Sequence, residues 1–141
     1  MVHALAEIRR TLKPNGILID LRPVEDNWTV EIHSAAGLQI AGRLTDVPIG
    51  KTDDEAAFAA MREVESLSWF TKEREEDFAF FYYWDTPSEM KEFMESEWED
   101  FEKMEESVYH TAQSLWSQAN ADARVRVRVK MLITKWMQGD A

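Results

Sequence analysis

The sequence of 141 residues contains no cysteine, and this absence excludes three kinds of chemistry. Disulfide bridges, thiolate nucleophiles and cysteine-ligated zinc all require the cysteine sulfur. The three histidines lie far apart along the chain and do not show the spacing of a histidine metal site. The motifs GxSxG, HExxH and the Walker loop are also missing. The sequence therefore predicts no catalytic residue and no metal site.

Glycine, long apolar runs and basic residues are scarce as well. The five glycines do not form a GxGxG pattern. Nucleotide sites of that type use these glycines so that the backbone can approach the nucleotide closely. No apolar run approaches the ~20 residues that span a bilayer and no signal peptide is visible, so we expect no membrane partner and a cytoplasmic location. Acidic residues outnumber basic ones, 27 to 16, for a net charge of −11. Nucleic acid is not expected as a partner, because its phosphates require a dominant basic face.

What the chain has in quantity is aromatic side chains, with six tryptophans, seven phenylalanines and three tyrosines. A chain of this length supports one compact domain, expected over residues 1–141, that buries about two-thirds of its unfolded surface. Aromatic residues in such number predict either a substantial core or an aromatic-lined cavity.

The beginning of the chain reads as a helix, a stop and a buried strand. A helix is predicted over residues 2–12. Its apolar residues Leu5, Ile8 and Leu12 fall on one face, and its charged residues fall on the other. Pro14 cannot continue a helix, and Asn15 and Gly16 tolerate the positive φ of a chain reversal. The apolar run that follows, with a strand predicted over 17–22, is typical of a strand covered on both faces.

This unit resembles a stretch of class I S-adenosylmethionine-dependent methyltransferases, in which a helix ending LAEIRRxLKPGG leads into the fifth strand of a seven-stranded sheet. The match covers residues 4–24, with Asn15 in place of the first of two glycines. In that family the unit follows the cofactor site, which uses a glycine-rich turn and an acidic residue for the ribose; here it opens the sequence. The resemblance implies a C-terminal methyltransferase piece, truncated or half of a split enzyme, with no cofactor-binding residue and no cofactor of its own. Such a chain is not expected to be an active enzyme alone, but only with a partner chain that carries the cofactor half.

The rest of the sequence predicts an α+β fold with a single mixed or antiparallel sheet of about five strands, resembling the C-terminal half of a Rossmann-like methyltransferase. Alternating apolar residues predict a hairpin of strands 28–33 and 38–44 and a last strand over 124–134. The apolar run 78–84 predicts a central strand, preceded by a charged link over 71–77. Helices are expected at 53–69 and 87–118.

Two capping boxes mark the starts of the two later helices. Thr52 is the expected N-cap of the first, and Thr86, followed by Pro87, of the second. The second helix, over 87–118, would be ~45 Å long, more than a small domain needs. We expect it either to break near Ser107 or to reach beyond its own domain to a partner.

A face of alternating cations lies on the last strand, formed by Arg124, Arg126, Arg128 and Lys130. It could bind an anion, form the outer face of a strand whose valines fill the core, or pair with the acidic stretch 89–106. The second and third alternatives are favoured, because an extended strand does not form the concave nest that phosphate prefers.

The family resemblance also suggests where a substrate would lie, since acceptor substrates there sit beyond the carboxyl ends of the strands. By that analogy the substrate-side candidates are Asp20, Arg22, Tyr82, Trp84 and Asp85. The strand over 17–22 would lack the neighbour that it has in the family. We therefore expect a homodimer through this edge, through the long helix, or through both.

Three functions remain open at this point. The first is the non-catalytic methyltransferase-derived domain described above. The second is a small-molecule binding module that uses the aromatic strand and Arg22 as its pocket. The third is an interaction domain that acts through an acidic helix face, represented by Glu95, Glu99 and Glu102.

Overall fold

A computed structural model of the chain describes residues 1–140. Over this range the helices are α1 (Val2–Thr11), α2 (Pro48–Ser66), α3 (Pro87–Phe93), the π-helical turn η1 (Met94–Trp98) and α4 (Glu106–Gln118). The strands are β1 (Ile17–Pro23), β2 (Thr29–Ser34), β3 (Gly37–Arg43), β4 (Thr45–Asp46), β5 (Phe70–Trp84), β6 (Glu102–Lys103) and β7 (Arg124–Gln138).

The predicted α+β class is confirmed, with a mostly antiparallel sheet. Five strands form this sheet in the order β1-β7-β2-β3, with β5 also paired to β7, and β4 and β6 form a separate two-stranded sheet. The chain divides into two compact units, and α2, β5 and β7 each run from one into the other. The expected single domain over 1–141 stays a prediction.

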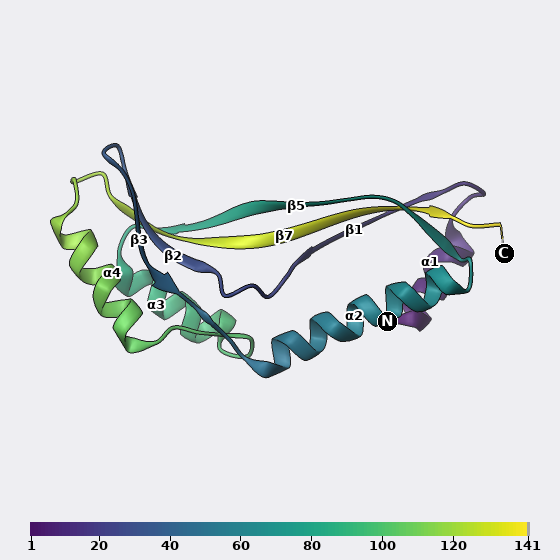
Figure 1. The fold of residues 1–141 in the computed structure, drawn as a ribbon, viewed down its shortest axis with the longest axis horizontal. Helices are drawn as coiled ribbons and strands as arrows, with labels where there is room; N and C mark the ends of the chain where they lie inside the picture. The colour runs from purple at the N-terminus through teal and green to yellow at the C-terminus, as the bar shows by residue number, and fades with distance from the viewer. Residues whose placement is uncertain (141) are drawn as a thin grey trace. The chain divides into compact units, whose positions relative to one another are not determined.

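The first unit comprises residues 1–24, 52–78 and the chain from Met131. Here β1 pairs antiparallel with β7, from Ile17 opposite Met137 to Pro23 opposite Met131. Figure 1 shows α1 and α2 on the same side of these strands. Buried residues between helices and strands form the core of this unit: Leu5, Ala60, Met61, Val64, Phe70 and Trp136.

The β1 strand leaves alternate apolar side chains exposed in this unit. Ile17, Ile19 and Leu21 are 50%, 53% and 54% exposed, whereas the residues between them are partly buried. Asn15 takes the left-handed conformation of the predicted reversal, with φ 61°. The helix–turn–strand start of the chain is therefore confirmed, but β1 is not covered on both faces as its sequence suggested.

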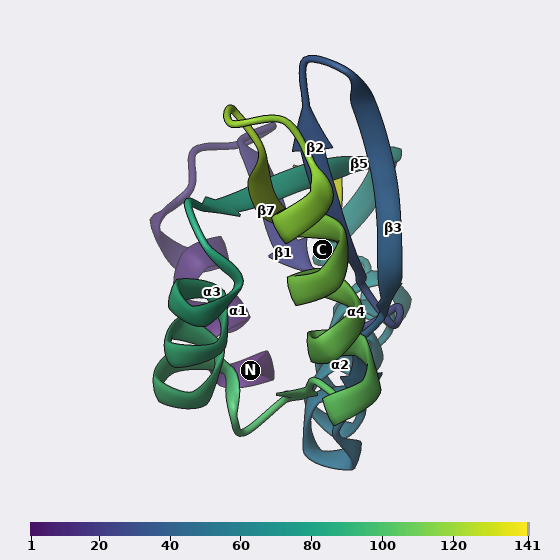
Figure 2. The ribbon, with the colours of Figure 1, turned by 90° about the vertical axis from the view of Figure 1, so that its left-hand side faces the viewer.

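The second unit comprises residues 25–51 and 79–130. Here β2 and β3 form the predicted hairpin around a two-residue turn, and β2 pairs with residues 124–128 of β7. The buried face carries the alternating apolar residues Val30, Ile32, Val125, Val127 and Val129. Helix α4 packs against β2 and β3, as Figure 2 shows from this side.

The predicted helix over 87–118 is wrong. Helix α3 ends at Phe93, η1 continues it to Trp98, residues 102–103 form β6, and α4 begins at Glu106. Aromatic packing explains the break, because Trp98 and Phe101 both contact the buried Trp28, with ring centroids 5.4 and 6.2 Å away. The Phe101 carbonyl oxygen then accepts a hydrogen bond from Val47 N at 2.9 Å, which holds the chain out of the helix. Of the two expected alternatives, a break near Ser107 or an extension beyond the domain, the chain follows the first, and the break lies before Ser107.

Two other boundaries differ from those expected. Helix α2 begins at Pro48, so Thr52 lies inside it and is not its N-cap. The charged link over 71–77 is part of β5, which begins at Phe70. Its charges are accommodated by ion pairs such as Lys135–Glu73 at 2.9 Å, and the stretch contains no glycine or proline to interrupt a strand. None of the helices in residues 1–140 is long and apolar enough to cross a bilayer.

Candidate functional site

Three carboxylates from separate segments converge in the second unit. Glu25 lies in the loop after β1, Asp46 on β4 and Glu102 on β6, and one oxygen of each lies within 4.8 Å of the others. Asp46 and Glu102 are direct partners in the β4–β6 ladder, which places them side by side. We call these three residues the carboxylate cluster.

The surrounding backbone determines how closely these groups approach. Gly50 lies beside Glu25: a Cβ atom there would be 2.8 Å from Glu25 Oε1 and 3.0 Å from the Cβ of Phe101. Any side chain at position 50 would therefore displace Glu25. The Asp46 carboxylate accepts hydrogen bonds from Asn27 N at 3.0 and 3.2 Å, which fixes its orientation.

Burial controls the charge of the cluster. Glu102 is 3% exposed and the Asp46 side chain 2%. Neither Glu102 oxygen has a hydrogen-bond donor among the described residues; its carboxyl faces those of Glu25 and Asp46 instead. Burial, followed by these two neighbouring carboxyls, raises the pKa of Glu102 from 4.5 to about 10. Burial and the two neighbouring carboxyls therefore both favour the uncharged form of Glu102.

A cavity of about 390 Å³ lies against Glu102 in the same unit. Its lining combines apolar and charged side chains from α3, η1, β6, α4 and the segments that follow β4, η1 and β6: Val47, Lys91, Met94, Glu95, Glu99, Glu102, Lys103, Met104, Glu106 and Tyr109. Two of them belong to the π-helical turn, a feature that is frequent at functional sites. A cavity of this size and mixed lining suits a small polar ligand.

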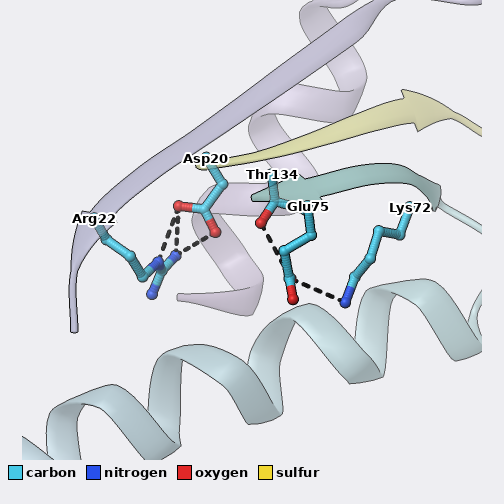
Figure 3. A network of polar contacts seen from close by, with 5 residues as sticks. All are labelled: Asp20, Arg22, Lys72, Glu75 and Thr134. Atoms are coloured by element: carbon cyan, nitrogen blue, oxygen red, sulfur yellow. Dashed lines mark hydrogen bonds and ion pairs between the residues drawn. The ribbon is translucent and has the colours of Figure 1, made fainter. Parts of the chain in front are cut away.

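The predicted candidates Asp20 and Arg22 form an ion pair on β1. Arg22 donates from Nε and Nη2 to Asp20 at 2.7–3.0 Å. Figure 3 shows this pair together with a second chain of contacts, from Thr134 to Glu75 at 3.2 Å and from Glu75 to Lys72 at 3.1 Å. The Arg22 guanidinium also lies over the Phe58 ring of α2, 5.8 Å from its centroid. These two charges therefore satisfy each other.

The other predicted candidates, Tyr82, Trp84 and Asp85, belong to the second unit. Tyr82 stacks on Trp84 with ring centroids 6.1 Å apart, and both rings contact Trp98 edge-on. Asp85 pairs with Arg124 at 3.2 Å. The aromatic strand thus packs against other aromatic rings, and Tyr82 and Trp84 are not among the residues that line the 390 Å³ cavity. A substrate role for the five candidates together stays a prediction.

The observed ion-pair partners of Arg124 and Arg126, on the cationic face of β7, lie outside the acidic stretch 89–106. Arg126 Nε donates instead to the buried Glu31 of β2 at 2.7 Å, and Arg124 pairs with Asp85. The buried Val125, Val127 and Val129 confirm that the opposite face of this strand fills the core.

Sequence reasoning missed the carboxylate cluster. It placed Glu102 on the exposed face of a long helix, whereas the structure buries this residue in β6. Glu25 lies in a loop, where acids are common, and Asp46 on a strand of only two residues, so the sequence around them contains no signal. Only the pairing of β4 with β6 brings the carboxyls together.

Comparisons of the chain with protein-family models, with curated proteins and with solved structures found no match.

Proposed function

We propose that these residues form a methyltransferase-related domain that is not catalytic by itself and that binds a second polypeptide along the edge of β1. The observation that carries the proposal is the place of β1 in the sheet. It stands at the end of the strand order, paired with β7, and within the described residues no strand occupies its other edge. An unpaired strand edge is a template for another chain.

The first segment supports the family relationship. Helix α1, the left-handed Asn15 and strand β1 follow one another as in the methyltransferase unit that the sequence resembles. The same 141 residues contain no GxGxG turn to hold the methyl donor. A methyltransferase built from this chain would take its cofactor site from other residues.

The chemistry of β1 supports binding at its edge. Protected edge strands carry charged side chains or prolines that discourage pairing. In β1 the charged residues Asp20 and Arg22 neutralise each other on the face toward α2, and Pro23 comes only at the end. The other face offers three half-exposed aliphatic side chains, so burial on association is favourable.

The partner that we propose is a second copy of the chain. Two β1 edges related by a two-fold axis would pair antiparallel and remove both open edges at once. A partner chain that carries the cofactor half of a methyltransferase is the other occupant of this edge, and it would compete with the second copy.

Native mass spectrometry at micromolar concentration tests the proposal. We expect a dimer with no adduct when S-adenosylmethionine is added. Replacing Ile19 by Lys places a charge on the exposed face of β1, and this variant should be monomeric while keeping the circular dichroism of the parent. Ile40→Lys, at an exposed position on β3 at the other end of the strand order, is the matched control and should remain dimeric.

Two outcomes would contradict the proposal. A monodisperse monomer of the parent chain would rule out the second copy as the occupant. A stoichiometric adduct with S-adenosylmethionine would mean that a donor site exists without the glycine turn, and the domain could then be catalytic.

A further inference from the structure

We propose that the carboxylate cluster of Glu25, Asp46 and Glu102 binds one Ca²⁺ ion. This site lies in the second unit and is independent of the β1 edge on which the proposed function rests.

The geometry fits the size of a calcium shell. Ca²⁺–oxygen distances of about 2.3–2.6 Å place oxygens on opposite sides of the ion about 4.6–5.2 Å apart. The three carboxylate oxygens all lie within 4.8 Å of one another, inside that diameter. Mg²⁺, with bonds of about 2.0–2.1 Å, needs a tighter octahedral arrangement. All three ligands are hard oxygens, which suit Ca²⁺ rather than a thiophilic metal.

The condition of Glu102 is the second, independent observation. Only 3% of Glu102 is exposed to solvent, and its carboxyl points into the cluster. Within residues 1–140, neither of its oxygens accepts a hydrogen bond from a donor. A buried carboxyl without a donor is costly, and the cost is met either by a proton or by a cation. Lys51 approaches the cluster at Asp46, with its Nζ 3.9 Å from the carboxylate, and its own side chain is exposed.

Glu31 is a buried acid whose charge is neutralised by protein groups alone. It is 2% exposed, about as buried as Glu102. Its Oε1 accepts a hydrogen bond from Arg126 at 2.7 Å and its Oε2 one from Thr29 at 2.8 Å. Glu102 has no comparable donor, and its polar neighbours are the carboxyl groups of Glu25 and Asp46. A bound cation would supply the positive charge that Arg126 supplies to Glu31.

The ion would have a structural role with access to the cavity. It would join three segments that are distant in sequence, namely the loop after β1, β4 and β6. Glu102 also lines the 390 Å³ cavity, so water or an anionic group of a small ligand could complete the coordination from that side. Because the unfolded chain does not preform the site, Ca²⁺ should stabilise the folded protein.

The experiment uses the full chain stripped of metal with a chelator, titrated calorimetrically with CaCl₂ and separately with MgCl₂. We expect one Ca²⁺ per chain, weaker binding of Mg²⁺, and a rise in melting temperature with CaCl₂. Glu102→Gln keeps the shape of the side chain and removes its charge, and it should weaken Ca²⁺ binding at least about 10-fold. Glu99→Gln, an acid of the same cavity outside the cluster, should bind Ca²⁺ as the parent does.

The outcomes separate a cation site from a cluster that is only protonated. A calcium concentration of about 10 mM exceeds the dissociation constants of the weakest biological calcium sites. If the cluster is only protonated, CaCl₂ at this concentration would produce no binding heat and no change in melting temperature. That result would overturn the proposal. Equal effects of Glu102→Gln and Glu99→Gln would also overturn it, as would tighter binding of Mg²⁺ than of Ca²⁺. Glu25→Gln, at the least buried of the three positions, repeats the test if Glu102→Gln does not fold.

Discussion

The charged residues of this chain differ most in how their neighbours neutralise them. Glu31 and Arg126 form an ion pair inside the second unit, with side chains 2% and 13% exposed. Arg126 also donates to the Tyr83 hydroxyl at 3.1 Å and lies over the Phe81 ring, 4.1 Å from its centroid. Alternation along β7 indicated an outward-facing arginine, and only the β2 register placed a glutamate opposite it.

Removing Arg126 should therefore be costly. Arg126→Met leaves Glu31 buried without its cation, and we expect a loss of about 3–5 kcal/mol in the free energy of unfolding, measured with urea at pH 7. The double variant Glu31→Gln/Arg126→Met should recover part of that loss, because no uncompensated charge is then buried. Losses that simply add would show that the two residues do not act as a pair.

At the scale of elements, local signals were reliable where the backbone itself requires a particular residue. Thr86 is the N-cap that its sequence predicted, since its Oγ1 accepts a hydrogen bond from Glu89 N at 3.2 Å and Pro87 is the first helical residue. The similar spacing at Thr52 does not start a helix, because α2 already begins at Pro48. A capping pattern predicts a possible start, and packing selects which one is used.

The cap at Thr86 gives a test at this scale. Thr86→Ala should lower the free energy of unfolding by about 1 kcal/mol, because the Glu89 N–H loses its acceptor. Thr111→Ala, in the interior of α4, is the matched substitution and should be neutral or stabilising by a few tenths of a kcal/mol, owing to the higher helix propensity of alanine. Thermal and urea unfolding followed by circular dichroism measure both; equal losses would contradict a capping role for Thr86.

The helix break between Trp98 and Glu106 could not be predicted from periodicity. Apolar residues recur at helical spacing through this region, and several of them are indeed buried. Their burial is achieved by a π-helical turn, an aromatic cluster and the β4–β6 pairing rather than by one continuous helix. Periodicity shows which side chains face inward, but not whether the backbone that carries them stays helical.

At the scale of the whole molecule, the two units share three continuous elements, α2, β5 and β7. The sequence predicted one domain, and the continuity of two long strands favours cooperative unfolding of both units. Val64 in the first unit and Val127 in the second are both fully buried and offer equivalent positions to test this.

Hydrogen exchange on Val64→Ala and Val127→Ala provides the measurement. Each substitution should cost about 2 kcal/mol, from lost apolar burial and a residual cavity. If the chain unfolds as one domain, either variant should speed exchange of the slowest amides in both units by a similar factor, about 30-fold. Faster exchange confined to the substituted unit would show two independent folding units.

The sequence by itself determined the α+β class, the helix–turn–strand start, the hairpin, the last strand and the cap at Thr86. These features depend on neighbours within a few residues, whose apolar alternation, capping oxygens and tolerance of positive φ are visible in the chain. Only the tertiary structure decided the length of β5, the break after Trp98, the partner of Arg126 and the meeting of Glu25, Asp46 and Glu102. Each of these depends on contacts between segments far apart in the sequence, where the chemistry of one residue is determined by a neighbour that its own segment does not reveal.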